Sequence, residues 1–559
     1  MKKRISLFLV LVFIVCIVVS CAKTDEDAPV ETGKEDAQIL PDESADDGKI
    51  KISEKGVLPI VDKPIEIEVF MAKSAQVEDY DENKYTKFLE ENTNIRVKWV
   101  LVPVEDRDQR LNVMLASNEP LPDVIMGGMS NQLLVEYGGQ GVFLPLNEYI
   151  EKQSINFIKL LDEYEELEMM ITAPDGNIYA LPNITMSIPN SYPFRMWINK
   201  VWLDNIGAQI PDTTEEFRSV LRDFKTKDPN QNGKDDDIPL VGSTGGWHTD
   251  GHAFFINSFI QCNTNDMYLI IDGKFEPVYL KEEYRNALRY LNSLVEEGLY
   301  DPISFTQDAD QLRALVENEE ACLVGCMPGG MPTANIGGER IKEFVALPPL
   351  EGPDGVRLSV HEPCNYLLYP NVFVITKDCE YPEAVFKWAD YMYDEEVSMR
   401  SRLGEPGVDW VEAEEGEVDL AGNPALYKAI LLWGTVHSSH WYNLNPTHEN
   451  FADRCVRSDD PYELQRLLWE ATYNCYIPYT PEDLSAYPPR QMLYTLEDSK
   501  KLNEINTVLR DYIKECRDKF ILGVMDIESD WDEYVNNLKS IGYEEVISIM
   551  QKRYDELTK

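Results

Sequence analysis

Positive charge is scarce in this chain of 559 residues. Lysine and arginine number 52, against 99 aspartate and glutamate residues, and the formal net charge is −47. Loss of the first twenty residues would also remove Lys2, Lys3 and Arg4, three positive charges, and lower the net charge to −50. A surface of this kind repels nucleic acid and anionic lipid, so we expect neither DNA nor RNA as a partner.

Signatures of enzymes and of disulfide scaffolds are missing as well. The sequence contains no G-x-S-x-G elbow, no H-E-x-x-H pair, no P-loop and no run of eight βα units. Beyond Cys16 and Cys21, eight scattered cysteines remain, too sparse for a disulfide framework, and the sequence does not decide whether any of them pair. These absences favour a binding protein over an enzyme. The rival class is a lipid-anchored glycosidase, which needs two carboxylates at a defined separation.

The first 56 residues predict an export signal followed by a tether. Residues 1–20 combine a basic start with an apolar run of fifteen, shorter than the roughly 20 residues that span a bilayer. "VVSC" then resembles the lipobox of bacterial lipoproteins, which implies that Cys21 carries fatty-acyl chains such as palmitate. Residues 21–56 are acidic and cannot bury a core, so we expect a disordered tether. The expected location is the extracellular face of the cell membrane.

The remaining body, from about residue 57, is too long for one hydrophobic core and predicts two domains. It opens with the alternating segment "IEIEVF", a helix-spaced stripe and a second alternating segment, "IRVKWVLV". The order β-α-β-α-β predicts a parallel sheet with right-handed crossovers. Because ligands of such sheets lie beyond the carboxyl ends of strands, we expect Ser130 and Asn131 at a cleft.

One short stretch, "DPNQNGKDDDIPL", predicts a calcium loop between a helix and a strand. Oxygen-bearing residues alternate around Gly233, and calcium prefers six to eight oxygen ligands. Position 12 is Pro239, so the closing glutamate of an EF-hand is missing. The alternative is a polar turn that holds no ion. The predicted ligands are Asp228, Asn230, Asn232, the backbone carbonyl of Lys234, Asp236 and Asp237.

Aromatic residues in glycine-rich or polar loops are candidates for sugar binding. A sugar stacks its C–H face on an aromatic ring, and its hydroxyls need polar partners when they are buried. The candidates are Trp247, His248 and Asp250, Asp409 and Trp410, and Trp441 and Tyr442. Trp433, His437, His440 and Asn443 lie in the same stretch as the last pair. Trp197, Trp202 and Trp388 lie in periodic segments and are expected in the core.

Four of the six histidines fall in two of these loops. His248 and His252 are four residues apart, and His437 and His440 are three apart. A zinc site at such pairs requires a helix, and glycines flank the first pair. We therefore expect histidines that make hydrogen bonds in loops or in the cleft.

Several longer stretches resemble the lipoprotein branch of the extracellular solute-binding proteins, the capture subunits of ABC importers for sugars. The main one is "MWINKVWLDNIGAQIPDTTEEFRSVLRDFKTKDPNQNGKDDDIPL", and "NIYALPN", "ALPPLEGPDGVR", "NVFVITKD" and "RLGEPGVDW" follow the same pattern. In that family a similar calcium loop is structural and lies away from the ligand. The resemblance implies a monomer that captures an oligosaccharide and delivers it to ABC permease subunits. A peptide, another polar solute or a sensor kinase partner remains open.

The family resemblance also implies the fold. We expect an α/β, two-lobed periplasmic-binding-protein-like fold of type II, in which each lobe is a mixed sheet flanked by helices. Hinge crossovers are expected near residues 179–193, 325–331 and 371–376. One lobe would comprise residues 57–180 and about 330–400, and the other residues 181–329 and about 401–559.

Overall fold

The computed structural model describes residues 49–559 apart from 118, 264–266, 333–335, 363–368, 432–433 and 443. The chain divides into an N-terminal unit, Met1–Lys49, and a body, Ile50–Lys559. The predicted signal, Cys21 and most of the predicted tether lie outside the described residues. Within residues 49–559, less those gaps, no helix is long and apolar enough to cross a membrane.

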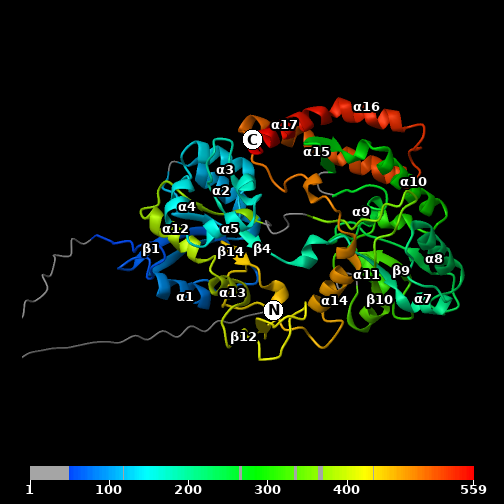
Figure 1. Ribbon diagram of the computed structural model, residues 1–559, viewed down its shortest axis with the longest axis horizontal. Helices are drawn as coiled ribbons and strands as arrows, with labels where there is room; N and C mark the ends of the chain where they lie inside the picture. Colours follow the sequence, from blue (N-terminus) through cyan, green and yellow to red (C-terminus); the bar gives the residue numbers. More distant parts are fainter. Residues whose placement is uncertain are drawn as a thin grey trace, which may run out of the picture. The chain divides into compact units, whose positions relative to one another are not determined.

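A six-stranded mixed sheet organises the first part of the body (Figure 1). Its order is β14-β4-β11-β3-β1-β2, and β1, β2 and β3 are parallel, as the β-α-β-α-β pattern predicts. The strands are Ile65–Ala72 (β1), Ile95–Val102 (β2), Val124–Met126 (β3), Leu181–Thr185 (β4), Tyr369–Ile375 (β11) and Thr447–Glu449 (β14). The helices in its two cores are Lys84–Thr93 (α1), Arg107–Ala116 (α2), Asn131–Gly139 (α3), Asn147–Gln153 (α4), Phe157–Glu163 (α5), Leu167–Ile171 (α6), Pro382–Tyr391 (α12) and Glu395–Leu403 (α13).

Local sequence explains the first βαβ unit. Ile65, Ile67 and Val69 of β1 are buried because alternate side chains of a strand face one side. Helix α1 starts where the side chain of Asn83 accepts a hydrogen bond from the backbone of Tyr85, and it stops at Asn94 in the left-handed region.

A four-stranded sheet with the order β10-β5-β9-β6 organises the second part. The strands are Met196–Asn199 (β5), Ile238–Leu240 (β6), Val324–Pro328 (β9) and Phe344–Leu347 (β10). Its helices are Lys200–Ile206 (α7), Thr214–Thr226 (α8), His252–Ile256 (α9), Glu282–Glu296 (α10), Ala309–Val316 (α11), Leu464–Ala471 (α14), Leu496–Ile521 (α15), Trp531–Ile541 (α16) and Tyr543–Leu557 (α17). Two small hairpins join Tyr268–Ile271 (β7) to Lys274–Pro277 (β8) and Trp410–Glu412 (β12) to Tyr427–Ala429 (β13).

The chain passes from one sheet to the other at places that agree only in part with the three predicted crossovers. Residues 186–195 connect β4 to β5 and overlap the first predicted crossover. The second prediction, residues 325–331, is wrong because that apolar segment is mostly β9, inside the four-stranded sheet. The chain returns between β10 and β11, and residues 371–375 belong to β11. Strand β14 pairs with β4, although residues after about 401 were expected with the other sheet.

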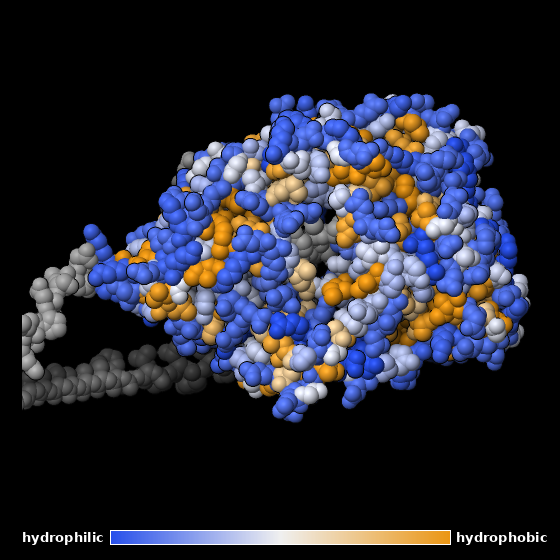
Figure 2. All heavy atoms as spheres, viewed as in Figure 1, coloured by the Kyte–Doolittle hydropathy of each residue, from blue (hydrophilic) through white to orange (hydrophobic). Residues whose placement is uncertain are grey.

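Tryptophan and cysteine side chains lie mainly in the interior, and hydrophilic side chains cover most of the surface. Trp197, Trp202 and Trp388 are fully buried, as expected. The seven described cysteines are free thiols, and burial raises the pKa of each. Figure 2 shows that most side chains on the visible face are hydrophilic, in keeping with the excess of acidic residues.

Candidate functional site

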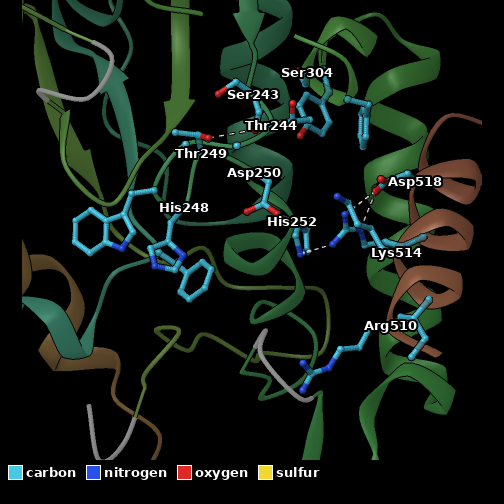
Figure 3. Close-up of a pocket in the computed structure, with 18 of the residues that line it drawn as sticks. Ser243, Thr244, His248, Thr249, Asp250, His252, Ser304, Arg510, Lys514 and Asp518 are labelled. Carbon is cyan, nitrogen blue, oxygen red and sulfur yellow. Dashed lines mark hydrogen bonds and ion pairs between the residues drawn. The ribbon is translucent and has the colours of Figure 1, made fainter. Parts of the chain in front are cut away.

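A cavity of about 470 Å³ lies between the segment that follows β6 and helix α15 (Figure 3). The segment after a strand at the edge of an α/β sheet is where ligands of such folds bind. It contributes Ser243, Thr244, Gly245, Gly246, Trp247, His248, Thr249, Asp250 and His252. The other walls come from Phe194, Met267, Tyr300, Ser304, Phe305, Arg510, Ile513, Lys514, Arg517 and Asp518.

Aromatic rings form one wall of this cavity. Trp247 remains 38% exposed, and its backbone carbonyl accepts a hydrogen bond from Gly330 at 2.9 Å. A Cβ atom on Gly330 would lie 2.5 Å from the indole, so glycine is required for this approach. The ring of His248 lies 5.3 Å from that of Trp247 and 3.9 Å from that of Phe194, centroid to centroid. The sequence predicted Trp247 and His248 here, but not Phe194.

A buried arginine supports this wall from behind. The guanidinium of Arg195 donates hydrogen bonds to the carbonyls of Gly330 and Pro189, both at 2.5 Å, and to Thr472 Oγ1 at 2.7 Å. Burial lowers the pKa of Arg195 to about 10, so it remains charged at neutral pH. Arg195 therefore ties the backbone beside Trp247 to the connection between the two sheets. An arginine inside the apolar run "PFRMWIN" is the signal that could have found it.

The opposite wall carries charges and a neutral histidine. Arg517 donates from Nη1 to His252 Nε2 at 2.5 Å, and from Nε to Asp518 Oδ1 at 2.8 Å. His252 Nδ1 lies 3.2 Å from Asp250 Oδ2. Burial and the Arg517 charge hold the pKa of His252 well below its usual range. Because Nε2 accepts from Arg517, the proton of the neutral ring sits on Nδ1 and faces Asp250.

Hydroxyl groups complete the lining. Ser243 Oγ is buried, and within the described part of the chain it has no hydrogen-bond partner. Thr249 Oγ1 donates to the carbonyl of Ser243 at 3.2 Å, and Ser304 Oγ accepts from Gly242 at 2.9 Å. Burial lowers the pKa of His248 to about 4, so its ring is neutral at pH 7. A buried unpaired hydroxyl and a neutral imidazole in the lining of one cavity suit a ligand that is rich in hydroxyl groups.

Ser130 and Asn131 line a second cavity, of about 430 Å³, together with Pro488–Met492 and α15. Arg510 lines both cavities, which are therefore adjacent. Ser130 Oγ accepts from Leu133 N at 3.3 Å and caps α3, and Asn131 Oδ1 accepts from Asn371 Nδ2 at 2.7 Å. Both side chains thus have local structural partners.

Three other candidates lie in the interior, which differs from the prediction. Asp409 is 4% exposed and accepts a hydrogen bond from Glu405 N at 2.7 Å. Trp410 donates from Nε1 to the carbonyl of Gly404 at 3.0 Å. Trp441 is 0% exposed and packs in an aromatic core with Tyr85, Trp99 and Trp388. None of the three presents a ring or carboxylate to the 470 Å³ cavity.

The second histidine pair lies elsewhere. The rings of His437 and His440 stack at 4.0 Å, and both line a separate cavity of about 170 Å³. Tyr442 is half-buried and meets His440 edge-on at 5.8 Å. Trp433 and Asn443 are outside the described residues. In residues 49–559, less the gaps given above, no three His, Cys, Asp or Glu side chains gather as metal ligands.

The predicted calcium loop lies between α8 and β6, as the pattern indicated. Asp228 accepts from Asn232 N and Gly233 N, both at 3.1 Å, and Asn232 Nδ2 donates to Asp236 Oδ1 at 2.9 Å. Asp237 Oδ1 is buried and makes no hydrogen bond to any described residue. Burial and the neighbouring carboxylates raise the pKa of Asp237 to about 6. An orphaned oxygen of Asp237 beside other carboxylates fits a divalent cation.

Comparison with known proteins identifies the family. Residues 73–399, more than half of the chain, match the model of the bacterial extracellular solute-binding protein family. The fructooligosaccharide ABC transporter substrate-binding protein FusA of Streptococcus pneumoniae is 28% identical over 501 residues, 87% of this chain and 90% of FusA. A solved structure of FusA with kestose has a TM-score of 0.69 at 25% identity, covering 88% of this chain and 99% of that chain.

A second solved structure, of a FusA EF-hand mutant with fructo-nystose, has a TM-score of 0.65 at 26% identity. The match covers 88% of this chain and 99% of that chain. These matches confirm the predicted two-lobed α/β fold. The chain belongs to the bacterial extracellular solute-binding protein family.

Proposed function

We propose that this protein captures an oligosaccharide outside the cell and delivers it to the permease subunits of an ABC transporter. The observation that carries the proposal is the partly exposed indole of Trp247, which stands at a cavity with hydroxyl, imidazole and charged side chains on its other walls. That combination matches a sugar, whose ring has an apolar face and hydroxyl edges. FusA, which covers most of this chain, is named for such a substrate.

In this proposal the protein binds its ligand and closes its two lobes around it, and it catalyses no reaction. Each lobe is proposed to form around one sheet, the first with residues 57–185 and about 369–449, the second with residues 196–347 and about 464–559. The hinge would lie in the connections between β4 and β5 and between β10 and β11, since a few residues between rigid elements absorb such motions. Arg195 and its three hydrogen bonds lie at the end of the first connection.

A panel of saccharides in a thermal-shift assay tests the proposal. A ligand present at 100 times its Kd stabilises the folded state by about 2.7 kcal/mol. We expect the melting temperature to rise with at least one oligosaccharide and to stay constant with peptides of similar length. A rise with peptides alone would replace the carbohydrate with a peptide as the ligand.

We also propose that the protein is held at the membrane as a monomer through lipid on Cys21. The basic start, the short apolar run and the cysteine support this anchor, and several acyl chains hold a protein stably at a membrane. The mass of the mature N-terminal peptide tests the proposal, because an unmodified Cys21 would contradict it.

A structural calcium ion is the proposed cofactor. Asp228, Asn230, Asn232, Asp236 and Asp237 would supply side-chain oxygens. Lys234 would supply its backbone carbonyl, since its ammonium pairs with Glu320. The ion would compensate the burial and the repulsion between carboxylates that raise the pKa of Asp237, and it would join α8 to β6. The FusA mutant named for its EF-hand shows that a loop of this class occurs in a relative.

The calcium proposal predicts a stability change that depends on one carboxylate. Calcium should raise the melting temperature of the wild type, and Asp228→Ala should abolish that gain while leaving ligand affinity nearly unchanged. Asp235→Asn is the matched control, because Asp235 is exposed and stands outside the predicted ligand set. Scanning calorimetry with calcium or with a chelator measures both. Equal melting of the wild type in the two conditions would contradict the assignment.

A further inference from the structure

The second cavity, of about 430 Å³, is lined from both parts of the body. Ser130, Asn131 and Gln132 lie at the start of helix α3, which follows β3 of the six-stranded sheet. Helix α15 belongs to the part built around the four-stranded sheet, and it contacts α3 directly. The rest of the lining comes from Pro488–Met492, Tyr494, Ser499, Leu502, Asn503, Asn506, Arg510 and Met550. A ligand in this cavity would therefore touch both parts of the body at once.

Amide side chains in this lining have hydrogen-bonding capacity left for a ligand. Asn506 is half-buried, and its amide makes no hydrogen bond to any residue within the described ranges. Gln132 is exposed, and its Oε1 accepts a hydrogen bond from Asn503 Nδ2 at 3.4 Å. The N–H groups of Gln132 have no partner among the described residues. Because a side-chain amide offers two donors and an acceptor, these groups suit the hydroxyls of a sugar, which both donate and accept.

Apolar groups line the same cavity as these amides. Pro488, Pro489 and Leu502 supply apolar surface to it. Small-molecule sites commonly combine an apolar lining with a few polar groups that fix the orientation of the ligand. A sugar unit has an apolar C–H face and hydroxyl edges, so the second cavity offers a sugar the same two kinds of contact that Trp247 and the hydroxyl groups offer in the first.

The two cavities are adjacent at Arg510, which lines both. A sugar unit held at Trp247 keeps the covalently linked next units close to the second cavity, which gives them a high effective concentration there. Contacts to α3 and α15 together exist only while the two parts of the body lie close to each other. A ligand that makes both sets of contacts therefore favours the closed arrangement, because its affinity differs between the open and the closed form.

We propose that the second cavity binds the additional sugar units of an oligosaccharide whose first units stack on Trp247, and that Gln132 and Asn506 bond the hydroxyls of these additional units. This inference rests on the proposed function and names its substrate class, saccharides long enough to occupy both cavities. Shorter saccharides fill only the cavity at Trp247 and bind more weakly. Chain length is thus recognised by two helices from different parts of the body.

Probes of one chemistry and two lengths test the inference. The trisaccharide and the pentasaccharide of the fructo-, malto-, cello- and xylo-oligosaccharide series are each titrated into the protein in a calorimeter. In at least one series, the pentasaccharide should bind the wild type about fivefold more tightly than the trisaccharide, or better, since one neutral hydrogen bond has an effect of about this size.

Two variants, one on each helix, locate the gain with length. Asn506→Ala should weaken binding of the pentasaccharide about fivefold and leave the trisaccharide unchanged. Gln132→Ala should do the same from α3. Thr507→Ala is the matched control and should bind both lengths like wild type, because Thr507 is an exposed polar residue of α15 that lines neither cavity. All three variants should melt like the wild type in the absence of ligand.

The outcomes separate the inference from the function on which it rests. Equal affinity for the two lengths in every series that binds would overturn the inference and leave oligosaccharide capture intact. A gain with length that survives in both Gln132→Ala and Asn506→Ala would also overturn it, because other groups would then hold the additional units. Equal weakening of both lengths in Asn506→Ala would overturn the assignment of this amide to the additional units. Absence of binding by every saccharide would overturn both the inference and the proposed function.

Discussion

Replacing Trp441 with alanine is expected to lower the free energy of unfolding by about 3–5 kcal/mol, the usual effect of deleting a buried tryptophan. The indole is fully buried against the rings of Tyr85, Trp99 and Trp388, and its Nε1 donates to Thr86 Oγ1 at 2.9 Å. The melting temperature of the corresponding transition should fall on the order of 10 °C in scanning calorimetry.

Ligand affinity separates this structural role from a role in the site. The folded Trp441→Ala variant should bind its ligand within about twofold of wild type, because the indole does not line the cavity. Trp441→Phe is the matched control, since it keeps an aromatic ring, loses the hydrogen bond to Thr86 and should lose much less stability. If Trp441→Ala melted like wild type but lost ligand binding, Trp441 would have to be assigned to the ligand site, as the sequence predicted.

The alanine variant of Trp247 should show the opposite pattern. Truncating a central aromatic anchor costs about 2 kcal/mol of binding energy, which is about thirtyfold in Kd. The melting temperature of the unliganded protein should change little, because the side chain is 38% exposed and packs mainly over Gly330. Titration calorimetry with the saccharide that gives the largest thermal shift measures the loss.

A control variant guards against a general surface effect. Tyr473→Ala removes an aromatic ring that is 52% exposed and stacks on Trp469 outside the cavity. It should bind like wild type. Wild-type affinity in Trp247→Ala would show that the indole does not bind the ligand. The proposed function would then lose the main observation that supports it, the exposed Trp247 ring at the cavity.

Local patterns were enough to predict several parts of the molecule. The period-2 alternation of β1 and β2 is read directly from the sequence, because alternate side chains are buried in the first residues of each strand. The alternation of oxygens around Gly233 located the loop between α8 and β6. The glycines before Trp247 predicted that this indole lies outside the core, and it is 38% exposed.

Other parts depend on contacts that no local pattern records. Gly404 and Gly407 precede Asp409 and Trp410 as two glycines precede Trp247, yet both of these side chains are buried. Trp410 opens β12 and packs against Tyr427 of β13. Residues 325–331 were predicted as a crossover, but residues 325–328 pair with β5 and β6 as part of the interior strand β9. Arg510, Lys514 and Arg517 are spaced i, i+4 and i+7 in the sequence, but only the fold places them at the cavity that Trp247 lines.

Titration calorimetry of the body, residues 57–559, with the saccharide panel tests the central claim most directly. The account predicts a saturating heat with one ligand per protein and a return to baseline after each injection. It further predicts that the same titration of Trp247→Ala shows an affinity about thirtyfold lower. Steady heat after mixing would show turnover and an enzyme, and silence with every saccharide would contradict carbohydrate capture.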